Sequence, residues 1–388
     1  MQSAVSSDVK RRVGIVTYIK NVNYGSVLQA FALQEFIASL GYDAGIVDFL
    51  DMSNAANRRE RRLRLLSGGL WAIRAPHATL ELRLRTGHAH GQPNEKRVTF
   101  DDFERERIRF FNDAIEKRRD YCSFVCGSDQ IWNLSVPGLH RTFFLRFASP
   151  AQRVAYAPSF GSDVVPSFNR RRLKKWISGF RAVSVREASG VDIVSNLTGN
   201  EPFCALDPVL LAGSQFWRAE IAEAKCQNEV SIHEDYLLCY FLSDNDPAIS
   251  MAMKEASRVG RQILWVETGV RPPKGVKALT PSPFEFVSLV DGAACFATDS
   301  FHGLAFALML KTPFLLFNRA YEANAKQATR IESLLNIVHA GLGNESAILR
   351  CDSSDLDWNA VSLCLEEERG RSAKYLVRAL DATCRKSV

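Results

Sequence analysis

The sequence predicts an α/β protein of two doubly wound domains, each with a parallel sheet between layers of helices. Three observations predict this fold class. Short apolar segments rich in β-branched residues alternate with longer segments that carry apolar residues at helical spacing. The alternation stops in a polar, mixed stretch over 209–235 and restarts at 236. The chain has 388 residues, 46% hydrophobic and 24% charged, which is enough for two domains, each with its own core.

The first half opens as a strand, a helix and a strand. Residues 13–19 are strand-like, 26–40 have helical spacing that ends at Gly41, and 45–49 is strand-like again. The alternation continues with strands at 123–126, 153–157 and 182–185 and a helix at 189–197. We therefore assign 1–208 to an N-terminal domain that is interrupted by a basic insert at 55–120.

The second half repeats the pattern and predicts a second domain over 236–350. Its elements are strands at 236–242, 262–266, 294–297 and 314–317 and helices at 248–259, 283–290 and 304–310. We expect a linker at 209–235 and C-terminal helices in 351–388 that pack back on the first domain. Two facing domains of this kind place a ligand in the cleft between them, at the carboxyl ends of the strands.

The sequence lacks the marks of a membrane-spanning or secreted protein. No run reaches the ~18–20 apolar residues that cross a bilayer, and the N-terminus has no signal-peptide apolar region. The nine cysteines are odd in number and lie mostly in apolar segments, so we expect buried thiols in the cytoplasm rather than disulfides. Cys122 and Cys126 are spaced CxxxC without a second pair, so we expect no metal site there. We also expect no resident cofactor.

The net charge of +6 is unevenly spread, with a basic cluster at 58–85. Its arginines face only Glu60 and Glu81 and are Arg58, Arg59, Arg61, Arg62, Arg64, Arg74, Arg83 and Arg85. Leu and Trp residues lie among them, which suits an anionic membrane surface. A solvated helix face that packs its leucines inward explains the pattern equally well. We expect no nucleic-acid partner, because aromatic residues are few and no binding module is recognisable.

His302 is the first candidate for chemistry. Residues 298–303, Thr-Asp-Ser-Phe-His-Gly, join the strand at 294–297 to the next helix. The first turn of such a helix has unpaired N–H groups and the positive end of the dipole, so it favours an anion on which a histidine can act. The other interpretation is that His302 only caps the helix or fills a polar pocket.

Two loops of the first half offer groups for a polar ligand. The first contains Asn23, Tyr24, Gly25 and Ser26, where Gly25 permits a tight turn and Ser26 can cap the helix. The second contains Ser128, Asp129, Gln130, Trp132 and Asn133, a set that suits a sugar. Ordinary capped turns are the alternative in both places, and we expect Trp132 in the core. Neither loop is a GxGxxG or P-loop motif.

Three arginines are candidates for binding an anion. Arg186 follows the strand at 182–185, where its planar fork is expected to point into the cleft and clamp a carboxylate or phosphate. The alternative is a structural ion pair with Glu187 or a nearby Asp. Arg319 and Arg330, which flank Tyr321 and Lys326, add positive charge beyond the strand at 314–317, although one or both also fit a plain surface role.

Six segments taken together resemble the polysaccharide pyruvyl transferase family. They are NYGSVLQA at 23–30, CGSDQIWN at 126–133, YAPSFG at 156–161, SVRE at 184–187, LDP at 206–208 and DSFHG at 299–303. The resemblance covers roughly residues 13–335 and leaves out the basic insert and the C-terminal tail. It implies a GT-B-like fold of two Rossmann-like domains, and transfer of pyruvate from phosphoenolpyruvate onto two hydroxyls of a sugar to form a ketal.

The resemblance also implies roles for individual residues. We expect His302 and Arg186 in catalysis. The expected donor-binding residues are Arg186, Ser300, Phe301, His302, Gly303, Arg319 and Arg330. The expected acceptor-binding residues, in the N-terminal domain, are Asn23, Tyr24, Gly25, Ser128, Asp129 and Gln130. The C3 methylene of the donor must gain a proton, for which histidine is well suited near neutral pH. Family members often carry Arg where this chain has Ser300. Either Arg319, Lys326 or Arg330 supplies that charge, or Ser300 marks a branch of the family that handles the donor differently.

Two other functions stay open. One is a GT-B glycosyltransferase that uses a nucleotide sugar, against which we find no nucleotide-binding Glu and Gly-rich loop in the second half. The other is a non-catalytic, glycan-binding scaffold of polysaccharide assembly, against which Arg186 and His302 argue. The expected partners are phosphoenolpyruvate, a sugar acceptor such as a lipid-linked oligosaccharide, and an anionic membrane through 58–85. The expected location is the cytoplasm, peripheral to the inner face of the cell membrane if the insert binds lipid.

Overall fold

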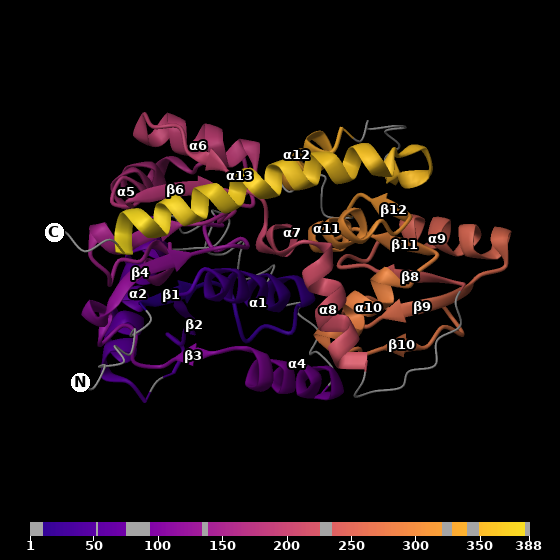
Figure 1. Cartoon of the computed structure of the whole chain (residues 1–388), viewed down its shortest axis with the longest axis horizontal. Coiled ribbons are helices and arrows are strands. Elements are labelled where there is room, and N and C mark those ends of the chain that lie inside the picture. The colour runs from indigo at the N-terminus through magenta and orange to yellow at the C-terminus, as the bar shows by residue number, and fades with distance from the viewer. Residues whose placement is uncertain are drawn as a thin grey trace, which may run out of the picture.

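Two α/β domains lie side by side in the computed structural model, which describes residues 11–384 except 52, 75–93, 134–138, 226–234, 320–327 and 340–348 (Figure 1). Each domain is built on its own sheet, and almost every strand pair is parallel. The predicted fold class is confirmed.

The first domain contains a seven-stranded parallel sheet in the order β3-β2-β1-β4-β5-β6-β7. Its strands are β1 (Arg12–Val16), β2 (Asp43–Val47), β3 (Phe110–Phe111), β4 (Tyr121–Cys126), β5 (Arg153–Ala155), β6 (Ala182–Val185) and β7 (Phe203–Cys204). Its helices are α1 (Tyr24–Ser39), α2 (Ala55–Arg74), α4 (Asn94–Arg107), α5 (Ser167–Ile177) and α6 (Ala188–Thr198), with 3-10 turns η1 (Arg118–Asp120), η2 (Arg141–Phe144) and η3 (Pro150–Gln152). The central strands β1 and β4 are almost wholly buried, because a parallel sheet is covered on both faces.

The second domain contains a six-stranded sheet in the order β10-β9-β8-β11-β12-β13, in which β13 alone of the described strands runs antiparallel to its neighbour. Its strands are β8 (Tyr236–Tyr240), β9 (Gln262–Val266), β10 (Ala278–Leu279), β11 (Cys295–Thr298), β12 (Phe314–Phe317) and β13 (Leu349–Asp352). Its helices are α9 (Asp246–Val259), α10 (Pro283–Asp291), α11 (Phe301–Leu310) and α12 (Ala328–Ile337), with the 3-10 turn η4 (Ser353–Asp355).

One hydrophobic cluster continues through both domains. It includes strand residues of both sheets, such as Val13 and Leu238, and most of α1 and α11. Within it the Tyr24 ring stacks on Phe286 with centroids 4.4 Å apart, and the Tyr24 hydroxyl donates to the carbonyl oxygen of Pro281 at 2.7 Å. Two smaller clusters belong to one domain each. Each domain thus has a core of its own, as predicted, but the shared cluster was not predicted. It forms because α1 and α11 are apolar nearly all round and are buried between the domains.

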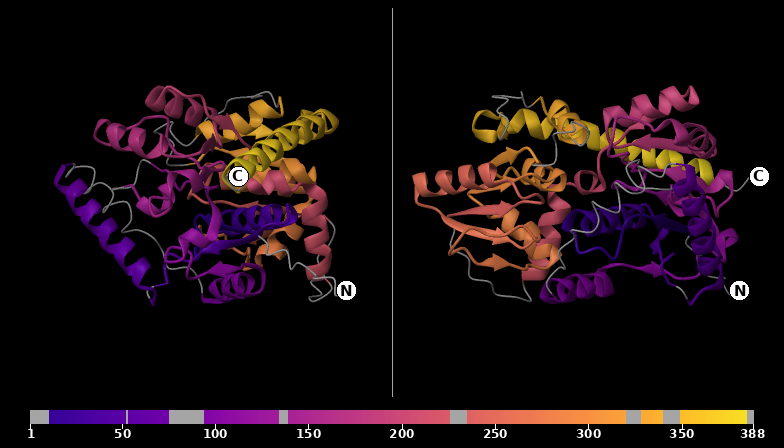
Figure 2. Two further views of the ribbon diagram at one scale, coloured as in Figure 1. Left: turned by 60° about the vertical axis from the view of Figure 1, so that its left-hand side comes forward. Right: turned by 180° about the vertical axis from the view of Figure 1, so that it is seen from behind.

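The chain crosses between the domains twice. It leaves the first domain through α7 (Pro208–Ala212) and α8 (Ser214–Lys225) and returns along α13 (Trp358–Cys384). Helix α13 runs past both domains and ends beside the first (Figures 1 and 2). Ser372 Oγ accepts a hydrogen bond from the N–H of Leu206 at 3.0 Å, and the Tyr375 hydroxyl donates to the carbonyl oxygen of Ala155 at 3.1 Å. These bonds fix α13 to the first domain.

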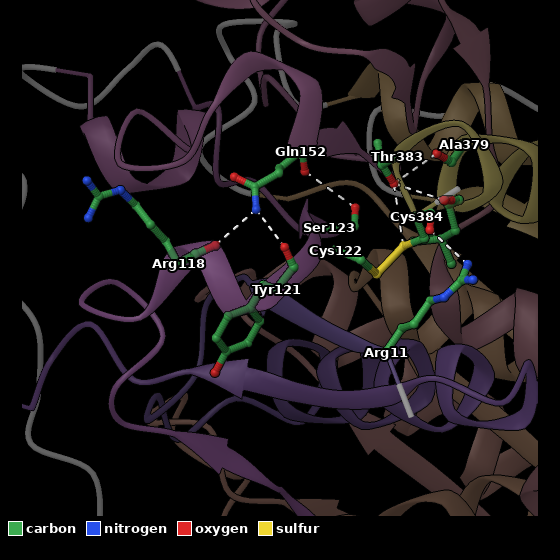
Figure 3. Close-up of a disulfide and its surroundings, with 10 residues drawn as sticks. Arg11, Arg118, Tyr121, Cys122, Ser123, Gln152, Ala379, Thr383 and Cys384 are labelled. Atoms are coloured by element: carbon green, nitrogen blue, oxygen red, sulfur yellow. Dashed lines mark hydrogen bonds between the residues drawn. A yellow bond between two sulfur atoms is a disulfide. The ribbon is translucent and has the colours of Figure 1, made fainter. Parts of the chain in front are cut away.

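A disulfide joins the end of α13 to β4. Cys384 is bonded to Cys122, and Arg11 Nη1 donates to the carbonyl oxygen of Cys384 at 2.8 Å (Figure 3). The expectation of thiols throughout is therefore wrong, because the return of α13 brings together two cysteines that are 262 positions apart in sequence. The free cysteines among the described side chains are Cys126, Cys204, Cys239, Cys295 and Cys364. The cysteine pattern accordingly no longer supports a cytoplasmic location.

The basic insert contributes α2 and α4. Helix α4 reaches the second domain, where Lys96 Nζ donates to the carbonyl oxygen of Glu267 at 2.5 Å. Arg83 and Arg85 of the predicted basic cluster lie outside the described residues. No helix in the described part of the chain is long and apolar enough to span a membrane.

Candidate active site between the two domains

A pocket lies between the domains at the carboxyl ends of the central strands. The strand order reverses between β1 and β4 in the first sheet and between β8 and β11 in the second, and ligands bind at such switch points. The pocket has a volume of about 270 Å³, just below the range of about 300–1,000 Å³ usual for small-molecule sites. It is lined by Tyr18, Asn23, Ser26, Asp129, Gln130, Asn133, Leu242, Ser300, Phe301, His302, Arg319 and Arg330.

His302 lies in the first turn of α11 and faces this pocket. Ser300 is the N-cap, and its Oγ accepts the N–H of Gly303 at 3.3 Å, so His302 is not the cap. His302 Nε2 is 3.5 Å from Asp207 Oδ2 and 3.5 Å from Arg186 Nη1. The His302 side chain is 12% exposed. The imidazole is thus held by buried charges on one side and open to a ligand on the other, as a proton-transfer group requires.

The first turn of α1 packs against the His302 ring. A Cβ on Gly25 would lie 2.1 Å from His302 Nδ1, so any larger residue would displace the ring. Gly25 therefore permits a close approach inside a helix and not the predicted tight turn. The predicted cap at Ser26 is also wrong, because Asn23 is the cap and its Oδ1 accepts the N–H of Ser26 at 3.1 Å. Tyr24 is buried in the shared core and does not line the pocket.

Asp129 lies across the pocket from the second domain. Its Oδ2 accepts the Ser26 hydroxyl at 2.7 Å, and its Oδ1 accepts the N–H of Gln130 at 2.8 Å. Burial works to raise the pKa of Asp129, but His302, Arg186 and these hydrogen bonds outweigh burial and lower the pKa. Asp129 is therefore ionised at neutral pH and can accept a hydrogen bond from a ligand hydroxyl.

The neighbours of Asp129 divide between pocket and core. Ser128 is fully buried, with its Oγ 2.8 Å from the carbonyl oxygen of Ala157, and does not line the pocket. Gln130 does, and with its amide oxygen turned toward Arg330 it accepts hydrogen bonds from both Nη atoms, at 2.7 and 3.0 Å. Trp132 stacks on Phe144 in the core, which confirms the prediction for Trp132.

Arg186 lies buried behind the pocket. Its side chain is 1% exposed, Nη1 donates to Asp207 Oδ2 at 2.6 Å, and Nη2 is 3.8 Å from Asp129 Oδ1. Its guanidinium lies over the Phe301 ring, 4.5 Å from the centroid. Burial works to raise the pKa of Asp207, but His302 and Arg186 lower it far below its usual value. Arg186 thus touches His302 and forms the structural ion pair named as the alternative, and its guanidinium does not line the pocket.

Arg319 and Arg330 both line the pocket. Arg319 Nε donates to the carbonyl oxygen of Asp299 at 3.1 Å. Arg330 is buried, and among the described residues its Nε has no hydrogen-bond partner. Burial and the like charges of Arg186 and Arg319 lower the pKa of Arg330 to about 9. Such a guanidinium is stabilised by an anion beside it. Lys326, the third proposed replacement for an arginine at position 300, lies outside the described residues.

The remaining second-domain candidates form the base of the site. Ser300 and Phe301 line the pocket, whereas Gly303 lies beneath it, where a Cβ would be 2.7 Å from Thr298 Oγ1. Three further residues, Tyr18, Leu242 and Asp207, had no predicted role. Tyr18 and Leu242 lie two residues beyond the ends of β1 and β8 and line the pocket. They were missed because the predicted strands at 13–19 and 236–242 extend too far and include them. Among the described residues, no group of three or more His, Cys, Asp or Glu side chains is placed to hold a metal ion.

Comparison with known proteins identifies a family. The family model described as polysaccharide pyruvyl transferase matches residues 23–321, well over half of the chain. No curated protein matches the sequence. Among solved structures, UDP-N-acetylglucosamine 2-epimerase from Rickettsia bellii is 10% identical with a TM-score of 0.47, over 97% of this chain and 99% of that one. The glycosyltransferase SnogD from Streptomyces nogalater is 13% identical with a TM-score of 0.45, over 95% and 100% of the two chains.

Proposed function

The chain belongs to the polysaccharide pyruvyl transferase family, and on that basis we propose that it transfers pyruvate from phosphoenolpyruvate onto two hydroxyls of a sugar in a surface polysaccharide or glycolipid, forming a ketal. One observation carries the proposal. His302, Arg319 and Arg330 of the second domain face Asn23 and Asp129 of the first across a single pocket. Basic groups suit an anionic donor, and oxygen acceptors suit the hydroxyls of a sugar.

The donor is proposed to bind on the second-domain side. Phosphoenolpyruvate carries a carboxylate and a phosphate, and planar guanidinium groups bind both in bidentate fashion. Arg319 and Arg330 supply this charge in place of the arginine that family members often have at position 300. The hydrogen bonds from Arg330 to Gln130 fix the orientation of its fork. The donor is small, in keeping with a pocket of about 270 Å³.

The proposed reaction begins with proton transfer from His302 to C3 of the donor. C3 becomes a methyl group, and the positive charge that develops at C2 is attacked by the first sugar hydroxyl. The C2–O bond to phosphate then breaks, and the second hydroxyl attacks C2 to close the ketal. One hydroxyl proton restores His302 and the other leaves with inorganic phosphate, so the protons balance. Asp129, held ionised, orients the attacking hydroxyl.

Arg186 is proposed to act through other residues. It holds Asp207 at 2.6 Å, and Asp207 and Arg186 together contact His302 Nε2. These contacts support a role for Arg186 in positioning the imidazole and Asp129, and Arg319 and Arg330 are proposed to contact the donor. Asn23 and Asn133 line the first-domain side with Asp129, where their amide groups can bind further sugar hydroxyls.

Ligand-dependent thermal unfolding tests the donor. A ligand that binds only the native state raises the melting temperature. We expect phosphoenolpyruvate to do so and uridine or guanosine diphosphate not to. Arg330→Lys keeps the charge but loses the fork, and we expect it to lose most of the shift. Arg258→Lys, on the exposed surface of α9, is the matched control and should keep the shift. Stabilisation by a nucleotide alone would instead indicate a glycosyltransferase, and by neither ligand a glycan-binding scaffold.

A further inference from the structure

Helix α2 exposes one face on which arginines and aliphatic side chains lie together. Leu65, Leu66 and Ile73 are 63%, 67% and 79% exposed. Arg59, Arg61 and Arg62 are also exposed. Positions 59, 62, 66 and 73 follow helical spacing, so they share a face, and positions 61 and 65, one turn apart, lie beside it. The helix lies along the outer edge of the first domain in every view (Figures 1 and 2). The alternative prediction, a solvated basic helix that packs its leucines inward, is therefore wrong for Leu65 and Leu66, which are exposed.

The opposite face of α2 holds the helix to the domain. Asn57 is buried and its Nδ2 donates to the carbonyl oxygens of Asp48 at 2.7 Å and Asp51 at 2.8 Å. Glu60, the one acidic residue of the α2 sequence, turns toward Arg141 at 3.5 Å. The outward face of the described residues is therefore basic and apolar, with its acidic residue turned away.

We propose that the outward face of α2 binds the surface of an anionic lipid bilayer. A helix with arginines for lipid headgroups and with leucine and isoleucine side chains for the acyl boundary lies in the interface plane. A second copy of the chain is a poorer occupant, because a two-fold interface would place arginines opposite arginines. The proposal concerns the surface and does not depend on the reaction in the pocket.

The bilayer surface and the pocket are connected through η2. Arg141, which pairs with Glu60, begins η2, and Phe143 of η2 meets the Tyr18 ring with centroids 4.8 Å apart. Tyr18 lines the pocket. Helix α2 is thus connected through η2 to a wall of the pocket in which a lipid-linked sugar acceptor would bind, a relation that rests on the proposed function.

Vesicle flotation of the whole chain tests the surface. We expect the protein to float with vesicles of phosphatidylglycerol and phosphatidylcholine at low salt, and to remain behind with phosphatidylcholine alone or at high salt. Each arginine near an anionic surface contributes about 1 kcal/mol, so Arg59→Ser, Arg61→Ser and Arg62→Ser together should weaken partitioning about a hundredfold. Leu65→Ser with Leu66→Ser should weaken it at least tenfold, by removing apolar insertion.

A charge-matched control separates α2 from net charge. Arg271, Lys274 and Lys277 are exposed in the segment that joins β9 to β10 of the second domain. These two strands lie on the opposite side of the molecule from α2 (Figure 1). Replacing all three by serine should leave flotation unchanged. The proposal is overturned if the wild type does not float, or if the control weakens flotation as much as the α2 variants. It is likewise overturned if the α2 variants only abolish a dimer seen by light scattering. All substituted side chains are exposed, so we expect the variants to keep the melting temperature of the wild type. An unchanged melting temperature shows that a variant is folded.

Discussion

Alanine at position 25 is expected to have opposite effects on stability in the presence and absence of the His302 ring. Alanine is the better helix former, which favours Gly25→Ala by at most about 1 kcal/mol in α1. The new Cβ, however, would lie 2.1 Å from His302 Nδ1, and overpacking of this kind costs about 1–3 kcal/mol. We therefore expect Gly25→Ala to lower the free energy of unfolding when His302 is present and to raise it in the His302→Ala background. The two substitutions are then coupled by about 2 kcal/mol.

Urea unfolding of the wild type, Gly25→Ala, His302→Ala and the double variant measures the coupling. The kinetics of Gly25→Ala give a second readout. Displacement of the imidazole by about 1 Å should lower kcat about a hundredfold. Gly370→Ala is the control, because Gly370 is exposed in α13 and a Cβ there meets nothing within 4 Å. It should stabilise both backgrounds equally. An equal cost of Gly25→Ala with and without the ring would refute the contact between α1 and His302.

Three further outcomes are expected. Burial lowers the pKa of Lys96 from 10.5 to about 8, so the unfolded state binds more protons between these values and the free energy of unfolding rises with pH across that window. Lys96→Met should abolish this slope and add about 3 kcal/mol at neutral pH, as urea unfolding at several pH values would show; a slope that persists would exclude Lys96 as its source. Asp207→Asn leaves Arg186 buried without its partner and should cost about 3–5 kcal/mol; Arg186→Met added to it should restore stability but not turnover, and recovery of turnover would contradict the positioning role. Cys384→Ser should lower the free energy of unfolding by up to about 5 kcal/mol and make it insensitive to reductant, whereas Cys364→Ser should change neither.

The sequence predicts the sheet strands that are long and apolar and misses the shortest ones. Strands at 182–185, 262–266 and 314–317 have the predicted bounds, because each is a short run of mostly apolar residues in an alternating strand and helix pattern. The edge strands β3, β7 and β10 have two residues each, too few to show any periodicity. Their pairing is decided by the neighbouring strand.

The site residues that follow a central strand in the sequence were predictable. His302 and Asp129 follow central strands, so both had to lie at the carboxyl edge of a sheet. The direction of the Arg186 side chain was not predictable, because Asp207, which draws it inward at 2.6 Å, lies beyond a further helix and strand. The need for glycine at position 25 was also not predictable, because the His302 ring that packs against it comes from the other domain.

The packing of α13 on the first domain also affects the order in which the parts of the pocket fold during synthesis. Ser372 bonds to the N–H of Leu206, the residue before Asp207, and Arg11 bonds to Cys384 at the other end of the chain. Ribosomes add about 5–20 residues per second and domains usually fold as they emerge. Here the nascent first domain must wait, with its α13-binding surface uncovered, until the second domain and then α13 have left the ribosome. The first domain, although it is made before the second, is thus completed after it.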